Sequence, residues 1–82
     1  MTVVVYGKQD CPLCSKALAA LEHLRPEFGF RIDYVDVTRD PELLARYREA
    51  IPVVLLDGRE IARLRVTIPA LRAALAGAGR RR

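Results

Sequence analysis

The sequence has one histidine, one methionine and only two cysteines, and none of its apolar runs is long. A membrane span needs roughly 18–20 consecutive apolar residues, and no segment of this chain approaches that length. Residues Met1–Tyr6 have no basic segment before them and no small-residue cleavage site after them, so they predict a strand and not a signal peptide. We therefore expect a cytoplasmic protein without a membrane partner.

The two cysteines are too few, and too close together, for a secreted domain stapled by disulfides. A bridge between Cys11 and Cys14 would close a very short loop and constrain the unfolded chain little. Zinc needs about four ligands, and the single histidine, His23, lies too far along the predicted helix to join Cys14, so it is interpreted as a surface residue. The pair therefore predicts thiol chemistry, while a dimer whose four thiolates share zinc or an iron–sulfur cluster stays open.

Aromatic residues are absent from the basic C-terminal end of the chain. The net charge of +4 comes from 14 basic and 10 acidic residues, and Arg80–Arg82 end the chain after Gly77–Gly79. Without stacking aromatics, this cluster favours a solvated tail over a nucleic-acid site. The length suits one domain, which we place at residues 1–76, and residues 77–82 are expected to form a basic, disordered tail.

The first half of the chain predicts a strand, a helix and a second strand. Val3–Tyr6 is a continuous apolar, β-branched run, as in a strand buried on both faces. Pro12 suits the first turn of a helix, and Pro26 and Gly29 are expected to end it. Arg31–Val37 alternates polar and apolar residues, as a strand does. The helix has one apolar stripe, formed by Leu13, Ala17, Leu18, Leu21 and Leu24.

The second half predicts a helix, a β-hairpin and a last helix. Asp40–Pro41 is a helix start, and its apolar side consists of Leu43, Leu44 and Tyr47. Val53–Leu56 is an apolar strand, Asp57–Gly58 is a strong hairpin signal, and Glu60–Leu64 predicts the returning strand. Thr67 can cap a helix whose apolar positions are Ile68, Leu71 and Leu75.

The predicted order of elements is β-α-β-α-β-β-α. Its first half is a βαβ unit, which requires a parallel strand pair and a right-handed crossover. Its second half adds an antiparallel hairpin and a closing helix. The simplest assembly is an α/β fold with a four-stranded mixed sheet and helices on both faces.

Cys11 and Cys14 differ in their expected surroundings. Cys11 precedes Pro12 at the start of the first helix, where unpaired backbone N–H groups and the positive end of the helix dipole favour a thiolate. Lys8 adds a cation on the same loop, and Asp10 opposes it. Cys14 lies one turn inside the helix and is expected to be more buried. Cys11 is therefore the predicted nucleophile and Cys14 the resolving thiol.

Ile51–Pro52 stands just before an apolar strand. Proline cannot donate to a sheet ladder, so the simpler interpretation is that Pro52 merely starts the strand. The functional interpretation is a cis bond opposite the Cys11–Cys14 loop, with Pro52 packed against the dithiol. The backbone groups of Ile51 would then be free to pair with an extended substrate, as in strand addition.

Both motifs resemble those of dithiol glutaredoxins. Lys8–Cys14 is similar to their Lys-x-x-Cys-Pro-x-Cys motif, and Ile51–Val53 is similar to their cis-proline motif. The likeness runs from about Val3 to Leu75, and its details resemble small bacterial glutaredoxin-like proteins. It implies the thioredoxin/glutaredoxin fold and a dithiol oxidoreductase that reduces protein or glutathione mixed disulfides. The implied partners are disulfide-bonded proteins or glutathione and an unidentified reductant, with no tightly bound cofactor or metal.

Two departures from the glutaredoxin pattern concern glutathione. Leu13 stands where glutaredoxins usually have tyrosine, and Arg63–Ile68 has no glycine where they have a Gly-Gly-x-Asp-like turn. Thr67, at a helix N-terminus, can still bind a carboxylate. We expect weak glutathione binding, with protein disulfides the better substrates. The alternative function is a thioredoxin-fold binding module that uses the groove beside Pro52, with the thiols incidental or bridging a metal.

Overall fold

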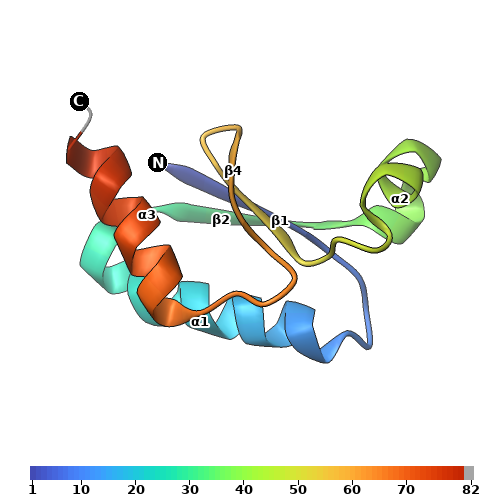
Figure 1. Cartoon of the computed structure of the whole chain (residues 1–82), viewed down its shortest axis with the longest axis horizontal. Helices are drawn as coiled ribbons and strands as arrows, with labels where there is room; N and C mark the ends of the chain where they lie inside the picture. Colours follow the sequence, from blue (N-terminus) through green and yellow to red (C-terminus); the bar gives the residue numbers. More distant parts are fainter. Residues whose placement is uncertain (81–82) are drawn as a thin grey trace.

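The computed structural model describes residues 1–80 and contains the elements in the predicted order (Figure 1). A short 3₁₀ turn, η1, follows the second strand and was not predicted. The elements are β1 (Thr2–Gly7), α1 (Pro12–Phe28), β2 (Arg31–Asp36), η1 (Val37–Arg39), α2 (Pro41–Tyr47), β3 (Val53–Leu56), β4 (Arg59–Arg63) and α3 (Ile68–Arg80).

The four strands form one mixed sheet in the order β2-β1-β3-β4. β1 and β2 are parallel, with Val5 opposite Tyr34, and β3 runs antiparallel to both β1 and β4. β1, β2 and β4 therefore all end where β3 begins. We call this the carboxyl end of the sheet. The N-termini of α1 and α3 and the Ile51–Pro52 bond all lie at this end.

Helices cover the two faces of the sheet unequally. α1 and α3 pack on one face, where the buried core consists of Val3, Val5, Ala20, Leu21, Leu24, Phe30, Val54, Leu56, Leu71 and Leu75. On the other face the seven-residue α2 lies at the carboxyl end (Figure 1). The ring of its Tyr47 stacks on that of Tyr6, with the ring centroids 5.0 Å apart. The expectation that β1 is buried on both faces is therefore wrong, because α2 is too short to cover the strand.

The first helix ends at the second of the two residues predicted to end it. Pro26 lies inside the last turn of α1, so it does not end the helix. Gly29 ends it, with φ = 70°, and its N–H donates to the Arg25 carbonyl at 2.8 Å. This left-handed backbone suits glycine, which has no Cβ to clash.

Two predicted turn signals are confirmed. Asp57 and Gly58 have φ values of 48° and 86°, the pair of positive angles that a type I′ hairpin requires. Asp40 caps α2, because its carboxylate accepts the N–H groups of Glu42 and Leu43. The strand after the hairpin ends at Arg63, and Leu64 leaves it with φ = 63°.

The prediction of a disordered tail from residue 77 is wrong for residues 77–80, which continue α3. Ala78 extends the stripe of Leu71 and Leu75 by one more turn and packs against the core, which stabilises helix at this point. Arg81 and Arg82 lie outside the described residues.

No helix within residues 1–80 is long and apolar enough to cross a membrane.

Candidate redox site

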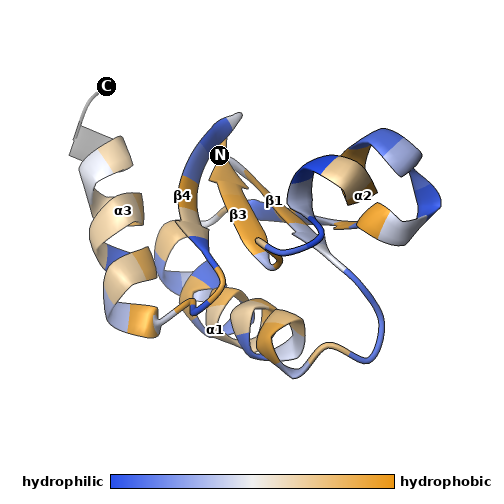
Figure 2. Cartoon of the chain, turned by 45° about the vertical axis from the view of Figure 1, so that its right-hand side comes forward, coloured by the Kyte–Doolittle hydropathy of each residue, from blue (hydrophilic) through white to orange (hydrophobic). Residues whose placement is uncertain are grey.

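The loop after β1 turns the chain sharply into the first helix. This loop is hydrophilic and appears in blue in Figure 2, in contrast to the orange β3. Asp10 has φ = 56°, a left-handed backbone that a short polar side chain tolerates. Cys11 then caps α1, with Pro12 in its first turn, as predicted. The Cys11 Sγ accepts the backbone N–H of Cys14 at 3.2 Å.

The two cysteines are free thiols in different surroundings. Cys11 is partly exposed, whereas Cys14 is 1% exposed and packs with Val37 and Ile51. Burial raises the pKa of the Cys14 thiol, and the hydrogen bond and negative charge of Cys11 raise it further. The nearby Lys8 backbone and the Tyr34 hydroxyl lower the pKa of the Cys14 thiol.

Lys8 contributes to this arrangement through its backbone. Its carbonyl accepts the Tyr34 hydroxyl at 3.1 Å, and its side chain is exposed. A role of the Lys8 ammonium near Cys11 stays a prediction. His23 is exposed on α1, as expected.

Ile51 joins the same cluster as both cysteines, and the Ile51–Pro52 bond is cis, as predicted. Pro52 is fully buried. The expectation that both backbone groups of Ile51 are free is wrong for the N–H, which donates to the Tyr47 carbonyl at 3.1 Å. The chain after α2 folds back on Tyr47, the last residue of the helix, and this brings the Ile51 N–H to the Tyr47 carbonyl.

Thr67 lies at the same end of the sheet, at the start of α3. Its Oγ1 accepts the Ala70 N–H at 3.3 Å, which confirms the predicted cap. The segment before it crosses close to the cis-proline, since the Leu64 N–H donates to the Pro52 carbonyl at 2.8 Å. Leu13 and Leu64 are large apolar side chains that remain about 40% exposed here.

Tyr34 and Gly7 complete the site and were missed in the sequence. The Tyr34 hydroxyl reaches from β2 to the loop that precedes Cys11. A Cβ on Gly7 would lie 2.9 Å from the Tyr34 ring and 3.1 Å from the Cys14 Sγ, so glycine is what allows these groups to approach. Tyr34 is itself 40% exposed, and the only signal in the sequence was a side chain with a polar hydroxyl at an apolar position of the alternating strand Arg31–Val37.

Residues 1–80 hold no cluster of three or more His, Cys, Asp or Glu side chains with the placement of a metal site. A metal bound by Cys11 and Cys14 would therefore need ligands from a second molecule.

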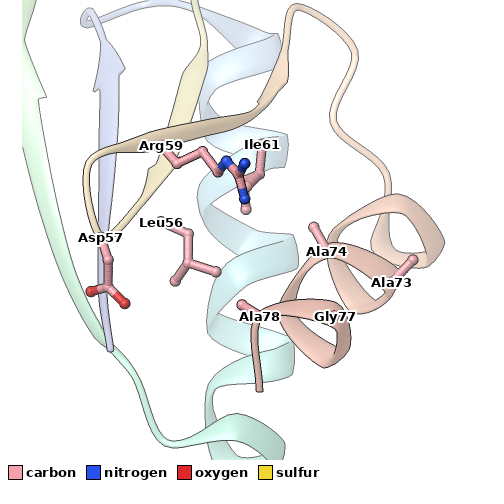
Figure 3. A pocket seen from close by; sticks show the side chains of 8 residues that line it. All are labelled: Leu56, Asp57, Arg59, Ile61, Ala73, Ala74, Gly77 and Ala78. Carbon is pink, nitrogen blue, oxygen red and sulfur yellow. The ribbon is translucent and has the colours of Figure 1, made fainter. Parts of the chain in front are cut away.

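A cavity of about 450 Å³ lies away from the thiols, between the β3–β4 hairpin and α3 (Figure 3). Arg59 and Ile61 of β4 face the small side chains of Ala74 and Ala78 across it. The hairpin pairs with the start of β1, so this cavity is at the opposite end of the sheet from Cys11. It contains no cysteine or histidine.

Comparison with known families identifies the domain. Residues 2–76 match the family described as Glutaredoxin-like domain (DUF836). The chain belongs to this glutaredoxin-like family. The match contains both the dithiol and the cis-proline, as the resemblance of the two motifs predicted. The fold and the Cys11–Cys14 pair support a redox function.

Curated relatives of this glutaredoxin-like protein are uncharacterized. Proteins of Mycobacterium tuberculosis and Mycobacterium bovis are each 38% identical over 63 residues, which is 71% of this chain. The match spans 65% of the length of those relatives.

Solved structures confirm the thioredoxin/glutaredoxin fold. A protein from X. campestris has a TM-score of 0.78 and 30% identity, covering 92% of this chain and 96% of its own. Fasciola hepatica thioredoxin has a TM-score of 0.63 and 29% identity, over 92% and 77% of the two chains. E. coli glutaredoxin shares the fold, with a TM-score of 0.63 and 23% identity over 95% and 96%.

Alkylation of the glutaredoxin-like protein is expected to be selective. Iodoacetamide at pH 7 should label Cys11 alone, because Cys14 is buried and its pKa is raised, so that it stays a protonated thiol. At a pH near 9 the alkylation of Cys14 should still be slow, and unfolding in guanidinium should make Cys14 reactive. Peptide mapping by mass spectrometry measures both sites. Equal labelling of the two cysteines in the folded protein would contradict the assignment.

Gly7→Ala is expected to lower the free energy of unfolding by about 1–3 kcal/mol, the usual cost of overpacking. The added methyl group would collide with Tyr34 and Cys14. Gly77→Ala is the matched control, because nothing lies within 4 Å of its new Cβ in α3 and alanine favours helix. Urea denaturation compares the two variants. A Gly7→Ala protein as stable as the wild type would show that the close approach at Gly7 is wrong.

Proposed function

We propose that this protein is a thiol–disulfide oxidoreductase that reduces protein disulfides through Cys11 and Cys14. The observation that carries the proposal is the contrast between the two thiols. Cys11 is accessible and receives a backbone N–H, while Cys14 is buried directly behind it with a raised pKa. A structural disulfide would not require this asymmetry.

In the first step the Cys11 thiolate attacks one sulfur of the substrate disulfide. The N–H of Cys14 stabilises negative charge on the Cys11 sulfur, and the start of α1 adds the positive end of its dipole. A bond forms between Cys11 and the substrate, and the other substrate sulfur leaves as a thiolate. Cys14 remains a thiol because burial and the nearby Cys11 charge raise its pKa.

In the second step Cys14 attacks the Cys11 sulfur of the mixed disulfide. Once Cys11 is bonded to substrate it no longer carries a negative charge, so one cause of the raised Cys14 pKa disappears. Cys14 can then lose its proton and release the reduced substrate. The order of the two steps thus follows from the electrostatic influence of one thiol on the other.

The substrate-binding surface is assigned to the residues around the cis-proline. Leu13 and Leu64 offer exposed apolar side chains on the dithiol motif and beside Pro52. The Ile51 carbonyl, for which the described residues show no donor, suits an extended chain that pairs with it. Thr67 at the start of α3 is the candidate for a substrate carboxylate. An extended protein segment suits this combination better than a small thiol does.

The catalytic cycle needs a reductant that returns the Cys11–Cys14 disulfide to two thiols. Glutathione or a reductase can supply the electrons, and the proposed mechanism uses no tightly bound cofactor. A reducing compartment suits a dithiol that must be restored after each turnover, so we place the protein in the cytoplasm.

Insulin reduction in the presence of dithiothreitol tests this function. The wild type is expected to accelerate the precipitation of the insulin B chain, and Cys11→Ser is expected to reduce the rate to background. His23→Ala, an exposed change on the same helix, is the matched control and should retain full activity. A wild type that does not exceed the dithiothreitol background would contradict the proposal.

A further inference from the structure

Tyr34 is a polar side chain that the proposed mechanism does not yet use. It lies on β2 opposite Val5 of β1, so its side chain is on the α1 face of the sheet, like Val5. From there the ring passes over Gly7, and the hydroxyl donates to the Lys8 carbonyl at 3.1 Å. The hydroxyl is thus held at the base of the dithiol loop.

The same place is occupied by the resolving cysteine. The Tyr34 ring and the Cys14 Sγ both come within about 3 Å of the position that a Gly7 Cβ would take. Cys14 is 1% exposed, so water has little access to its sulfur. A thiolate at this buried position needs hydrogen-bond donors from the protein.

We propose that the Tyr34 hydroxyl donates a hydrogen bond to the Cys14 thiolate and thereby accelerates the resolving step. This inference rests on the dithiol function proposed above. The hydroxyl turns from the Lys8 carbonyl to the sulfur when Cys14 loses its proton, a rotation about one bond. The Lys8 carbonyl serves as its partner in the resting protein.

The step is balanced without a further reactant. Cys14 gives its proton to solvent, and its thiolate forms a bond to the Cys11 sulfur. The bond between Cys11 and the substrate sulfur breaks, and the substrate leaves as a thiolate with the electron pair. The two cysteines are oxidised to a disulfide and the substrate is reduced by two electrons.

Of the described side chains around Cys14, Tyr34 is the hydrogen-bond donor that can serve its thiolate. Cys11 raises the Cys14 pKa, and the Lys8 backbone and Tyr34 lower it. Asp36 at the end of β2 acts on Tyr34, and Tyr47 of α2 packs in the same cluster. Burial, and then the charge of Cys14, raise the pKa of Tyr34 to about 12, so the hydroxyl keeps its proton at neutral pH.

Reaction with 5,5′-dithiobis(2-nitrobenzoate) separates the two steps. Attack by Cys11 releases one equivalent of thionitrobenzoate, and attack by Cys14 on the resulting mixed disulfide releases the second. Stopped-flow absorbance follows both phases as a function of pH in wild type, Tyr34→Phe and Tyr6→Phe. Tyr6→Phe removes the same hydroxyl from the neighbouring strand, where the described residues show no hydrogen bond to it.

Tyr34→Phe is expected to slow the second phase about tenfold at pH 7, the loss of one hydrogen bond to a charged group. The pH midpoint of that phase should rise by about one unit, while the rate of the first phase stays unchanged. Tyr6→Phe should behave as the wild type.

An unchanged second phase in Tyr34→Phe would overturn this inference and leave the dithiol function intact. Slowing of both phases together would also overturn it, since it would show that Tyr34 only holds the loop. A wild type that releases a single equivalent would overturn the dithiol function itself, and this inference with it.

Discussion

Cys14→Ser is expected to accumulate a stable mixed disulfide through Cys11, and Cys11→Ser is expected to accumulate none. The physical reason is that Cys14 provides the intramolecular exit from the mixed disulfide, and serine at this position has no thiolate to attack with. Cys11 is partly exposed at the start of α1, whereas Cys14 is 1% exposed and cannot reach a substrate directly. Each variant is incubated with oxidised glutathione or a disulfide-bonded protein, and mass spectrometry locates the adduct.

The two variants are matched controls for each other, because each retains one thiol and loses the other. Wild type under the same conditions should end as the intramolecular Cys11–Cys14 disulfide, without an adduct. Adducts on Cys14 in the Cys11→Ser protein would reverse the two roles. A Cys14→Ser protein that stays unmodified would contradict the nucleophilic role of Cys11.

Glutathione mixed disulfides are expected to be reduced with a kcat/KM about tenfold to hundredfold lower than that for a protein disulfide. The segment between β4 and α3 has no glycine, and Leu64 already takes a left-handed backbone there. The Thr67 hydroxyl accepts the Ala70 N–H as a helix cap, and its own O–H remains the candidate donor to a γ-glutamyl carboxylate where the glycine turn is missing. One missing charge-assisted hydrogen bond costs about 1.5–3 kcal/mol, which corresponds to the stated factor.

Parallel assays with a glutathionylated peptide and with insulin, at the same reductant concentration, measure this preference. A shorter side chain in place of Leu64 should reduce this preference for protein disulfides, because Leu64 is exposed and is part of the proposed substrate-binding surface. Leu64→Ala is therefore expected to weaken insulin reduction and leave the glutathione reaction unchanged. Equal kcat/KM values for the two substrates in the wild type would refute the preference.

Local patterns in the sequence predicted most of the secondary structure. The helix start at Pro12 follows from the preference of proline for the first turn, and the start at Pro41 follows from Asp40, which caps the first N–H groups of α2. The Asp57–Gly58 hairpin follows from the positive φ angles that these residues tolerate. The cysteine motif and the proline at residue 52 could also be recognised in the sequence, because each is a pattern of a few consecutive residues.

Expectations that concerned the extent of packing were less successful. The apolar run in β1 predicted two buried faces, but the coverage of a face depends on the length of α2. The glycines near the C-terminus predicted a tail, but Ala78 packs on the core and α3 continues to Arg80. In both cases a distant element, absent from the local pattern, decided the result.

The sequence by itself determined the order of elements, the position of Cys11 at the start of α1 and the cis-proline at residue 52. Only the tertiary structure placed Tyr34 of β2 beside Gly7 and Cys14, and directed the N–H of Ile51 to Tyr47. The parallel register of β1 and β2 sets the first of these contacts. Side-chain alternation restricts the register to pairings that keep the apolar side chains on the core face, and it does not choose among those pairings, so the partner of Tyr34 is known only once the strands pair.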